Sequence, residues 1–289
     1  MLSSRTSEPD SYSTRTMIAE SHRASQPEHL RVGLPQPRVI ERWLCQALDR
    51  QGVIDPHERR AMLTDLYDRL ECGEPLQYVL GTWQFRWIEL RVDRRALIPR
   101  PETELMVEWI LAELAGRESP RVLELGTGTG AIAAALAHEL PSVSVVATDV
   151  SADALALAQD NIVSLRLNRC IDLRQGSWWE AVEEHERFDL ICSNPPYIAD
   201  TEWNSLDPMV RDWEPRRALT AGPTGLECYE VIFHEARGRL GGQQGAVVLE
   251  IGSSQGFNVR RLAIDAGFDD VVIHKDLAGR DRFLVARFR

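Results

Sequence analysis

A run of alternating glycines between a strand-like segment and a helix-like segment constrains the fold of this chain more than any other feature. Residues 121–125 are mostly apolar and strand-like, residues 126–130 read Gly-Thr-Gly-Thr-Gly, and the alanine-rich run 131–137 favours a helix. Glycines permit tight turns and a close backbone approach to a ligand, and a helix N-terminus favours polar or anionic groups. The pattern indicates a nucleotide-type loop in an α/β sheet, with a plain β–α turn as the alternative. It has neither the usual dinucleotide-binding spacing nor the Gly-Lys-Ser/Thr of a phosphate loop.

An acidic residue ends the next strand-like run. Asp149 follows residues 143–148, about twenty positions after the glycine loop, where a carboxylate can accept hydrogen bonds from both hydroxyls of a ribose. The alternative is that Asp149 caps the following helix, although Ser151 can serve as that cap itself. After a third strand-like run at 171–174, Trp178 is an aromatic residue that could pack on an adenine ring or belong to the core.

A neutral tetrapeptide follows a fourth strand-like run, residues 188–192. Asn194, Pro195, Pro196 and Tyr197 therefore stand at the carboxyl end of a buried strand, where open α/β sheets place their ligands. The two prolines remove two backbone donors and leave carbonyl oxygens in set directions, beside the acceptor oxygen of the Asn side chain. Such acceptors suit a planar NH2 group that must be oriented but not ionised. A loop in which Asn-Pro-Pro only turns the chain is the alternative.

Taken together, these motifs resemble the S-adenosylmethionine-dependent methyltransferases that have a Rossmann-like seven-stranded sheet. More narrowly, the chain is similar to the protein-(glutamine-N5) methyltransferases that modify class 1 peptide-chain release factors. Further segments that match that family are Gly73–Tyr78, Leu97–Glu104, Glu214–Leu219 and Lys275–Arg282. The likeness runs from about residue 73 to the C-terminus and, more loosely, back to about residue 37. Single motifs are shared with DNA and RNA methyltransferases, but their combination in this order is specific.

The resemblance implies a mostly parallel sheet whose last strand is antiparallel, and S-adenosyl-L-methionine as the cofactor. The cofactor-binding positions that it implies are Gly126, Thr127, Gly128, Thr129 and Gly130 along the methionine and ribose, Asp149 at the ribose, Trp178 near the adenine, and Asn194. Ser177 stands where many relatives carry an acid, which puts the strength of the contact with the adenine region in question.

The same resemblance implies what the tetrapeptide does. Asn194, Pro195, Pro196 and Tyr197 would hold the substrate glutamine, which lies in the Gly-Gly-Gln motif of the release factor. The implied activity is methyl transfer to the amide nitrogen of that glutamine, in support of translation termination. Gly241-Gly242-Gln243 of this chain repeats the tripeptide, so self-methylation is an alternative, although glycines are also expected in a turn before a strand.

Composition narrows the choice of partners. The 289 residues carry a formal net charge of −11, which repels nucleic-acid phosphates unless a local basic patch compensates. The longest apolar stretch is far too short to span a bilayer. Five scattered cysteines have no paired metal spacing and indicate reduced thiols. We expect a cytoplasmic monomer with a protein partner, no metal, and no direct contact with a membrane or nucleic acid.

Three parts are expected along the chain. Residues 1–36 lack periodicity and predict a disordered tail. Residues 37–98 predict a helical substrate-recognition domain with a linking hairpin, in which Asp55 and Pro56 open the second helix as N-cap and first residue. Residues 99–289 are expected to form the methyltransferase domain.

Other functions remain open at this stage. A related enzyme class methylates a glutamine of a ribosomal protein and carries the same tetrapeptide, and adenine-N6 methyltransferases of nucleic acids use a similar one. A nicotinamide-binding oxidoreductase would use the glycine loop and Asp149 but leaves Asn194 to Tyr197 unexplained. A non-catalytic cofactor-binding module would not need an intact substrate loop.

Overall fold

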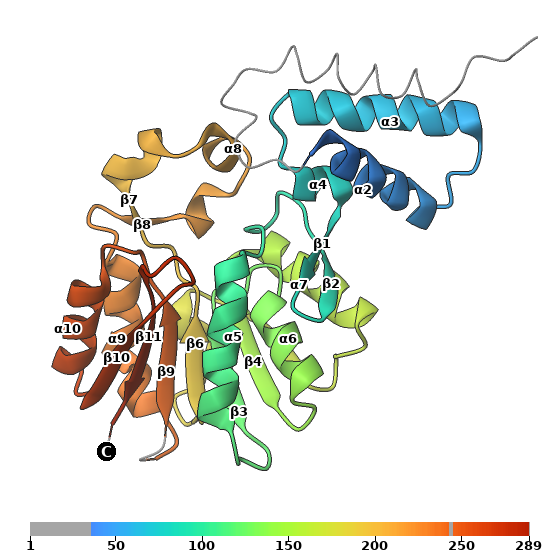
Figure 1. The fold of residues 1–289 in the computed structure, drawn as a ribbon. Coiled ribbons are helices and arrows are strands. Elements are labelled where there is room, and N and C mark those ends of the chain that lie inside the picture. The colour runs from blue at the N-terminus through green and yellow to red at the C-terminus, as the bar shows by residue number, and fades with distance from the viewer. Residues whose placement is uncertain (1–35, 243–244, 289) are drawn as a thin grey trace, which may run out of the picture. The chain divides into compact units, whose positions relative to one another are not determined.

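The computed structural model describes residues 36–242 and 245–288. They form two compact units, which divide between Leu80 and Gly81 (Figure 1). The sequence interpretation placed this boundary after residue 98 and grouped the hairpin with the helices. In the structure the hairpin belongs to the larger unit, because its second strand packs on two helices of that unit. The expected tail at 1–36 lies outside the described residues apart from Gln36.

The smaller unit is helical over its described residues. Asp55 caps its second helix as predicted, since the Asp55 carboxylate accepts hydrogen bonds from the backbone N–H groups of His57 and Glu58 at 3.0 and 2.8 Å. Arg69 near the end of that helix donates to the carboxylate of Glu74 at 2.8 Å. The helices of this unit are α2 (Pro37–Arg50), α3 (Pro56–Glu71) and α4 (Leu76–Leu80).

The larger unit is built on a seven-stranded sheet with the order β10-β11-β9-β6-β3-β4-β5. Its strands are β3 (Arg121–Leu125), β4 (Ser144–Asp149), β5 (Ile171–Gln175), β6 (Leu190–Ser193), β9 (Ala246–Glu250), β10 (Asp270–Lys275) and β11 (Asp281–Arg287). β11 alone runs in the opposite direction to the other six strands of this sheet. This confirms the predicted Rossmann-like methyltransferase sheet, with mostly parallel strands and an antiparallel last strand.

Helices cover both faces of the sheet (Figure 1). Successive strand residues such as Val122 and Leu123 belong to the cores on opposite faces, because side chains alternate along a strand. The hairpin packs with α5 and α6 on one face, and α9 and α10 cover the other. The elements named here are β1 (Thr82–Phe85), β2 (Ile88–Arg91), α5 (Pro101–Leu114), α6 (Ala131–Glu139), α9 (Glu227–Arg239) and α10 (Gly256–Asp265), with α7 (Ala152–Ser164) between β4 and β5.

An insertion of short elements follows β6 and precedes α9. It comprises β7 (Ile198–Ala199), η3 (Asp200–Ser205), α8 (Pro208–Arg211), η4 (Arg216–Ala218) and β8 (Thr220–Gly222), and β7 pairs with β8. Glu214 of the insertion is buried. Its carboxylate accepts a hydrogen bond from the backbone N–H of Ile98 at 3.0 Å and forms an ion pair with Arg100. The insertion is thereby joined to the segment that leads into α5.

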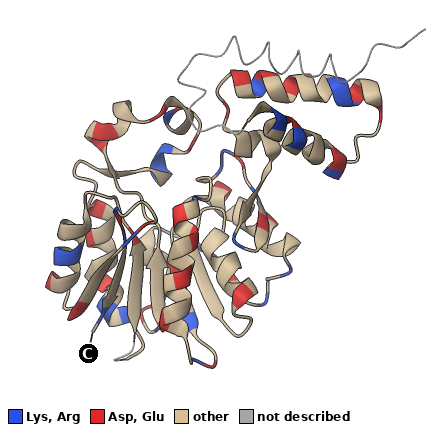
Figure 2. Cartoon of the chain, viewed as in Figure 1, with Lys and Arg blue, Asp and Glu red and all other residues tan. Residues whose placement is uncertain are grey.

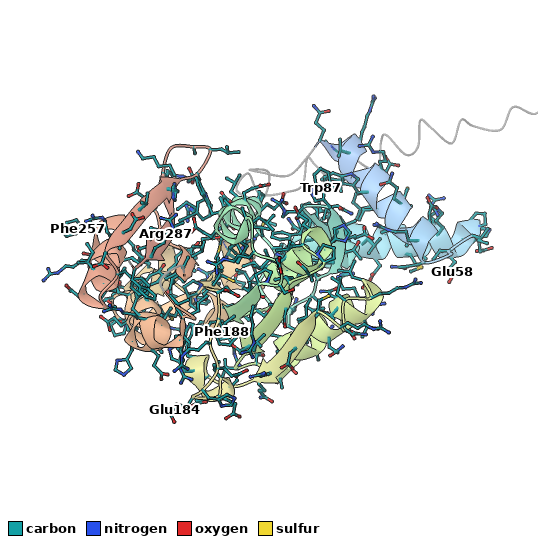
Figure 3. The ribbon with its side chains drawn as sticks, turned by 90° about the horizontal axis from the view of Figure 1, so that it is seen from below. Glu58, Trp87, Glu184, Phe188, Phe257 and Arg287 are labelled. Carbon is teal, nitrogen blue, oxygen red and sulfur yellow. The ribbon has the colours of Figure 1, made fainter. Side chains whose placement is uncertain are left out.

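Acidic and basic residues are interspersed along the helices in the view of Figure 2, and the central strands are mostly uncharged. Arg287 at the end of β11, labelled in Figure 3, forms ion pairs with Glu113 of α5 and Asp270 of β10. Among the described helices, none is both long enough and apolar enough to cross a membrane. Gly241 and Gly242 lie just before the first residue of β9, at the amino edge of the sheet, and Gln243 lies outside the described residues.

Candidate active site

The glycine loop connects β3 to α6 and takes up backbone conformations that other residues rarely adopt. Gly126, Gly128 and Gly130 have φ angles of +74°, +55° and +79°, in the left-handed region that glycine enters without steric penalty. A Cβ atom added at Gly130 would lie 3.2 Å from the Cβ of Ala158 in α7. The loop therefore requires glycine for its turn, and Gly130 also for the close packing of α7 against the start of α6.

Asp149 at the end of β4 holds this loop in place. Its two carboxylate oxygens accept hydrogen bonds from the backbone N–H groups of Gly128 and Ser151, each at 2.9 Å. Helix α7 is capped by Ser151 instead, whose Oγ accepts from the N–H of Ala154 at 3.3 Å. Burial raises the pKa of Asp149 above its ordinary value, and the hydrogen bonds from Ser151 and Gly128 oppose that rise. Asp149 is therefore placed as the sequence predicted, at a strand end beside the glycine loop.

Glu124, to which the sequence interpretation gave no role, holds the glycine loop from the preceding strand β3. It is buried within β3, and its Oε2 accepts hydrogen bonds from the Thr127 hydroxyl at 2.8 Å and the Ala133 N–H at 3.1 Å. Burial raises the pKa of Glu124 to about 8. A carboxyl group among Val122, Leu123 and Leu125 of this strand was the signal that could have identified it.

A cavity of about 260 Å³ opens beside the glycine loop. Its wall includes Asp149, Ser177 and Trp178, the last of which has an unusual φ of +51°. The neighbouring Trp179 is instead buried in the core and donates its indole N–H to the Val231 carbonyl at 2.8 Å. Of the predicted cofactor positions, those that line the cavity are Gly126, Thr127, Gly128, Thr129, Asp149, Trp178 and Asn194. Gly130 turns the chain into α6 and is not part of the wall.

A second cavity, of about 190 Å³, adjoins the first. Pro195 and Tyr197 line it, together with Glu250 at the end of β9. Both cavities share the wall residues Leu97, Arg100, Asn194 and Ala218. The tetrapeptide thus lies at the border of the two cavities, with Pro196 on the side of the first.

The backbone and side chains of the tetrapeptide are held by residues from distant parts of the chain. Gln255 donates from Nε2 to the Tyr197 carbonyl at 2.8 Å. Asn194 donates from Nδ2 to the Thr103 hydroxyl at 3.2 Å, and that hydroxyl donates to the Glu250 carboxylate at 2.7 Å. Burial raises the pKa of the Tyr197 phenol, so this ring is neutral. The tetrapeptide itself is therefore neutral, and the Glu250 carboxylate is linked to it through the Thr103 hydroxyl.

Comparison with known proteins shows which family and which fold this chain resembles. A family model described as "Methyltransferase small domain" matches residues 102–212. The release factor glutamine methyltransferase of Rhodopirellula baltica is 37% identical over 248 residues, covering 83% of each chain. That of Bordetella pertussis is 43% identical over 242 residues, covering 83% of this chain and 86% of the relative. The catalytic domain of hMettl16 in complex with the MAT2A 3'UTR hairpin 6 shares the fold, with a TM-score of 0.57 and 18% identity over 69% of this chain and 75% of that one.

The strand order, the glycine loop and the acidic residue at the end of β4 define an S-adenosylmethionine-dependent methyltransferase. The identity to curated relatives and its extent go further, and the chain belongs to the release factor glutamine methyltransferase family. Its cofactor is S-adenosyl-L-methionine. The first cavity is compatible with this cofactor, because its wall contains a carboxylate, an aromatic ring and the polar backbone of the glycine loop.

Proposed function

We propose that the protein methylates the side-chain amide nitrogen, N5, of the glutamine in the Gly-Gly-Gln motif of class 1 peptide-chain release factors, and so supports translation termination. The observation that carries this proposal is the position of Asn194 at the border of the two cavities. A methyl donor in the first cavity and an amide in the second would meet at this residue. We place the reaction in the cytoplasm, where release factors act.

On the cofactor side, we infer that Asp149 accepts hydrogen bonds from the ribose hydroxyls while its own orientation is held by Gly128 and Ser151. Trp178 would pack along the adenine, and the glycine loop would follow the ribose and methionine. When bound, the cofactor supplies an electrophilic methyl group on a sulfonium. The residues around it need only bind it and direct that methyl toward the second cavity.

On the substrate side, the neutral groups of the tetrapeptide suit the chemical properties of an amide. A glutamine nitrogen is a poor nucleophile because its lone pair is delocalised into the carbonyl. As the nitrogen gains a methyl group it becomes positive, and its hydrogens become stronger donors. The Asn194 side-chain oxygen and the Pro195 carbonyl would accept those hydrogens, and so bind the transition state better than the ground state. They also orient the nitrogen toward the first cavity, and Tyr197 would pack against the flat amide.

No ionised base is required at the nitrogen before the methyl group arrives. The amide proton becomes acidic only after the C–N bond has formed, when it can leave to water. This agrees with a centre made of Asn194, Pro195, Pro196 and a neutral Tyr197. On the substrate side, the Glu250 carboxylate reaches Asn194 only through the Thr103 hydroxyl.

We also propose that the smaller unit, with helices α2, α3 and α4, recognises the folded release factor. Glycines beside the target glutamine would let its loop enter a narrow cavity where bulkier neighbours would clash. The protein is expected to act as a monomer and to contact no nucleic acid directly.

The test is to incubate the enzyme separately with purified release factor and with the ribosomal protein of the large subunit that the related enzyme class methylates, using cofactor labelled in its methyl group. We expect label on the Gly-Gly-Gln glutamine, located by mass spectrometry of the digested factor. A factor in which that glutamine is replaced by alanine provides the control and should remain unlabelled. Label in the ribosomal protein but not in the release factor would refute the proposed substrate.

A further inference from the structure

We propose that Thr103 and Glu250 are positioning residues that set which end of the Asn194 amide faces the substrate. Neither contacts the reacting atoms in this scheme. They act through a chain of two hydrogen bonds that ends on Asn194. The inference rests on the proposed function of Asn194, and it adds two residues to which the sequence interpretation gave no role.

The chain joins three elements that are distant in sequence. Thr103 lies in the first turn of α5, Glu250 is the last residue of β9, and Asn194 follows β6. The Asn194 Nδ2 donates to the Thr103 Oγ1 at 3.2 Å, and that hydroxyl donates to the Glu250 Oε2 at 2.7 Å. Thr103 and Glu250 are only 5% and 2% exposed, so bulk water does not compete freely for either bond.

The direction of these bonds follows from the charge on Glu250. An ionised carboxylate can only accept hydrogen bonds, so the Thr103 hydroxyl must give its one proton to Glu250. The lone pairs of the Thr103 oxygen then accept from the NH2 of Asn194. With its NH2 held in this way, Asn194 presents its carbonyl oxygen as the remaining polar group, which is the acceptor that a substrate amide requires.

Protonation of Glu250 would allow the opposite direction. A neutral carboxyl can donate to the Thr103 oxygen, which frees the Thr103 hydroxyl to donate to the Asn194 oxygen. The Asn194 amide would then turn and present its NH2 to the NH2 of the substrate. Two donors cannot pair, so the acceptor required at the reacting nitrogen would be lost.

The surroundings of Glu250 place this change near neutral pH. Burial is the largest influence and raises its pKa to about 7, against the hydrogen bond from Thr103. Arg282 of β11 and Arg100 before α5 lower it, and Glu102 of α5 raises it. The other titratable groups that face it are Tyr197 and Tyr229, and the Tyr229 hydroxyl donates to the Glu250 backbone carbonyl at 3.4 Å. Burial raises the pKa of both phenols, so they stay neutral in this range.

The test measures single-turnover methyl transfer to the release factor at saturating cofactor from pH 5.5 to 9. The wild-type rate should fall about tenfold per pH unit below the midpoint of the Glu250 titration, as expected for a single required ionisation. Thr103→Val should lower the rate at pH 8 about tenfold to a hundredfold, less than the roughly 10²–10³-fold for loss of a direct contact, because Asn194 itself remains. Thr103→Ser keeps the hydroxyl and should keep the wild-type rate. Glu250→Gln should remove the low-pH decline, because its side chain does not titrate.

A matched control is Thr82→Val, which removes another threonine–glutamate hydrogen bond, of 3.3 Å to Glu89, in the hairpin. It should leave both the rate and its pH dependence unchanged. The affinity of Glu250→Gln for the cofactor should stay within about twofold of wild type, since Glu250 lines the second cavity and not the first. A full rate for Thr103→Val, or an unchanged low-pH decline in Glu250→Gln, would overturn the inference.

A second measurement needs no substrate. In wild-type protein labelled with ¹⁵N, the Asn194 side-chain NH2 signals should shift with the titration of the Glu250 carboxyl, and in Thr103→Ser they should still do so. If the chemical shifts of the Asn194 NH2 do not change over this titration, the inference would also be overturned. If the wild-type protein fails to label the release factor while these signals do titrate, the proposed substrate is wrong and the hydrogen-bond chain stands.

Discussion

Buried glutamates hold the loops at the carboxyl edge of the sheet. Glu124 receives hydrogen bonds from the glycine loop, Glu214 from Ile98, and Glu250 from Thr103. The groups that face the two cavities could be predicted from the sequence, because Asp149 and Asn194 follow strand-like runs directly. Glu124 lies near its partners in the sequence, but the roles of Glu214 and Glu250 could not be predicted, since their partners are more than a hundred residues away. Hydrogen bonds between residues so far apart in sequence depend on the tertiary arrangement of the elements, which no local pattern reveals.

Replacement of Asn194 by alanine should lower the single-turnover rate of methyl transfer about a hundredfold or more. The reason is the loss of one preorganised acceptor at the reacting nitrogen. Cofactor affinity, measured by calorimetry, should change much less. The exposed Asn168 provides the control, and Asn168→Ala should be as active as wild type. A near-normal rate for Asn194→Ala would remove this residue from the catalytic centre.

Replacement of Asp149 by alanine should weaken cofactor binding by roughly 1.5–3 kcal/mol, the range for a hydrogen bond to a charged group. Calorimetric titration with S-adenosyl-L-methionine measures this directly. Asp153→Ala, in the first turn of α7 and exposed, is the matched control and should bind normally. Equal affinities for the two variants would contradict the assigned role of Asp149, provided that both unfold at the same urea concentration as wild type.

Glu124 should make the stability of the protein depend on pH. Its pKa is about 8 in the folded protein against 4.5 for the ordinary group, so folding favours its protonated form. That stabilising contribution is complete below pH 4.5 and is lost as the pH rises through 8. Because one pKa unit corresponds to about 1.4 kcal/mol, the difference between 4.5 and about 8 corresponds to a loss of about 5 kcal/mol. Glu124→Gln keeps an acceptor oxygen and should show a flatter pH dependence in urea unfolding, whereas parallel profiles would contradict this assignment.

At the scale of elements, the strand, loop and helix around residues 121–139 could be predicted because each has a strong local pattern. The insertion at 198–222 could not. Its strands and single turns are two to six residues long, too short for either hydrophobic periodicity to be recognised. They are held by tertiary contacts such as the Arg100–Glu214 ion pair, which no local pattern reveals.

The glycine loop offers a prediction at this scale. Gly126→Ala and Gly130→Ala should both destabilise the protein by about 1–2 kcal/mol, because alanine is disfavoured at positive φ. Gly130→Ala should lower the free energy of unfolding by about 1–3 kcal/mol more than Gly126→Ala. A Cβ at position 130 would press on Ala158 of α7, whereas a Cβ at position 126 meets nothing within 4 Å. Urea unfolding of both variants measures the difference. Equal losses would show that α7 yields without strain.

At the scale of the whole molecule, the class of the fold and the order of its parts could be predicted, but the limits of the compact units could not. The amino-acid composition does not change between the hairpin and the loop and helix that follow it. The sequence therefore offered no reason to assign β1 and β2 to the larger unit. Their assignment rests on the packing of β2 against α6 and α7.

The boundary at Leu80 allows a direct test of the proposal that the smaller unit recognises the release factor. A chain that begins at Gly81 should retain cofactor binding, because every residue that lines the first cavity lies after this point. It should no longer methylate the intact release factor if the smaller unit recognises that partner. Calorimetry and transfer of labelled methyl groups measure the two properties. Undiminished methylation by the shortened chain would refute the recognition role of α2, α3 and α4.

The position of β11 has a consequence for the order of events during synthesis. β11 is the last strand in the chain, yet it lies between β9 and β10 and pairs with both. Until residues 281–287 leave the ribosome, β9 has no partner on one side, and Glu250 lacks the neighbouring Arg282. Every residue that lines the first cavity, the glycine loop included, precedes β9 in the chain, so this cavity can form earlier. The substrate half of the site must therefore mature after the cofactor half, so a nascent chain should acquire affinity for the methyl donor before it can methylate anything.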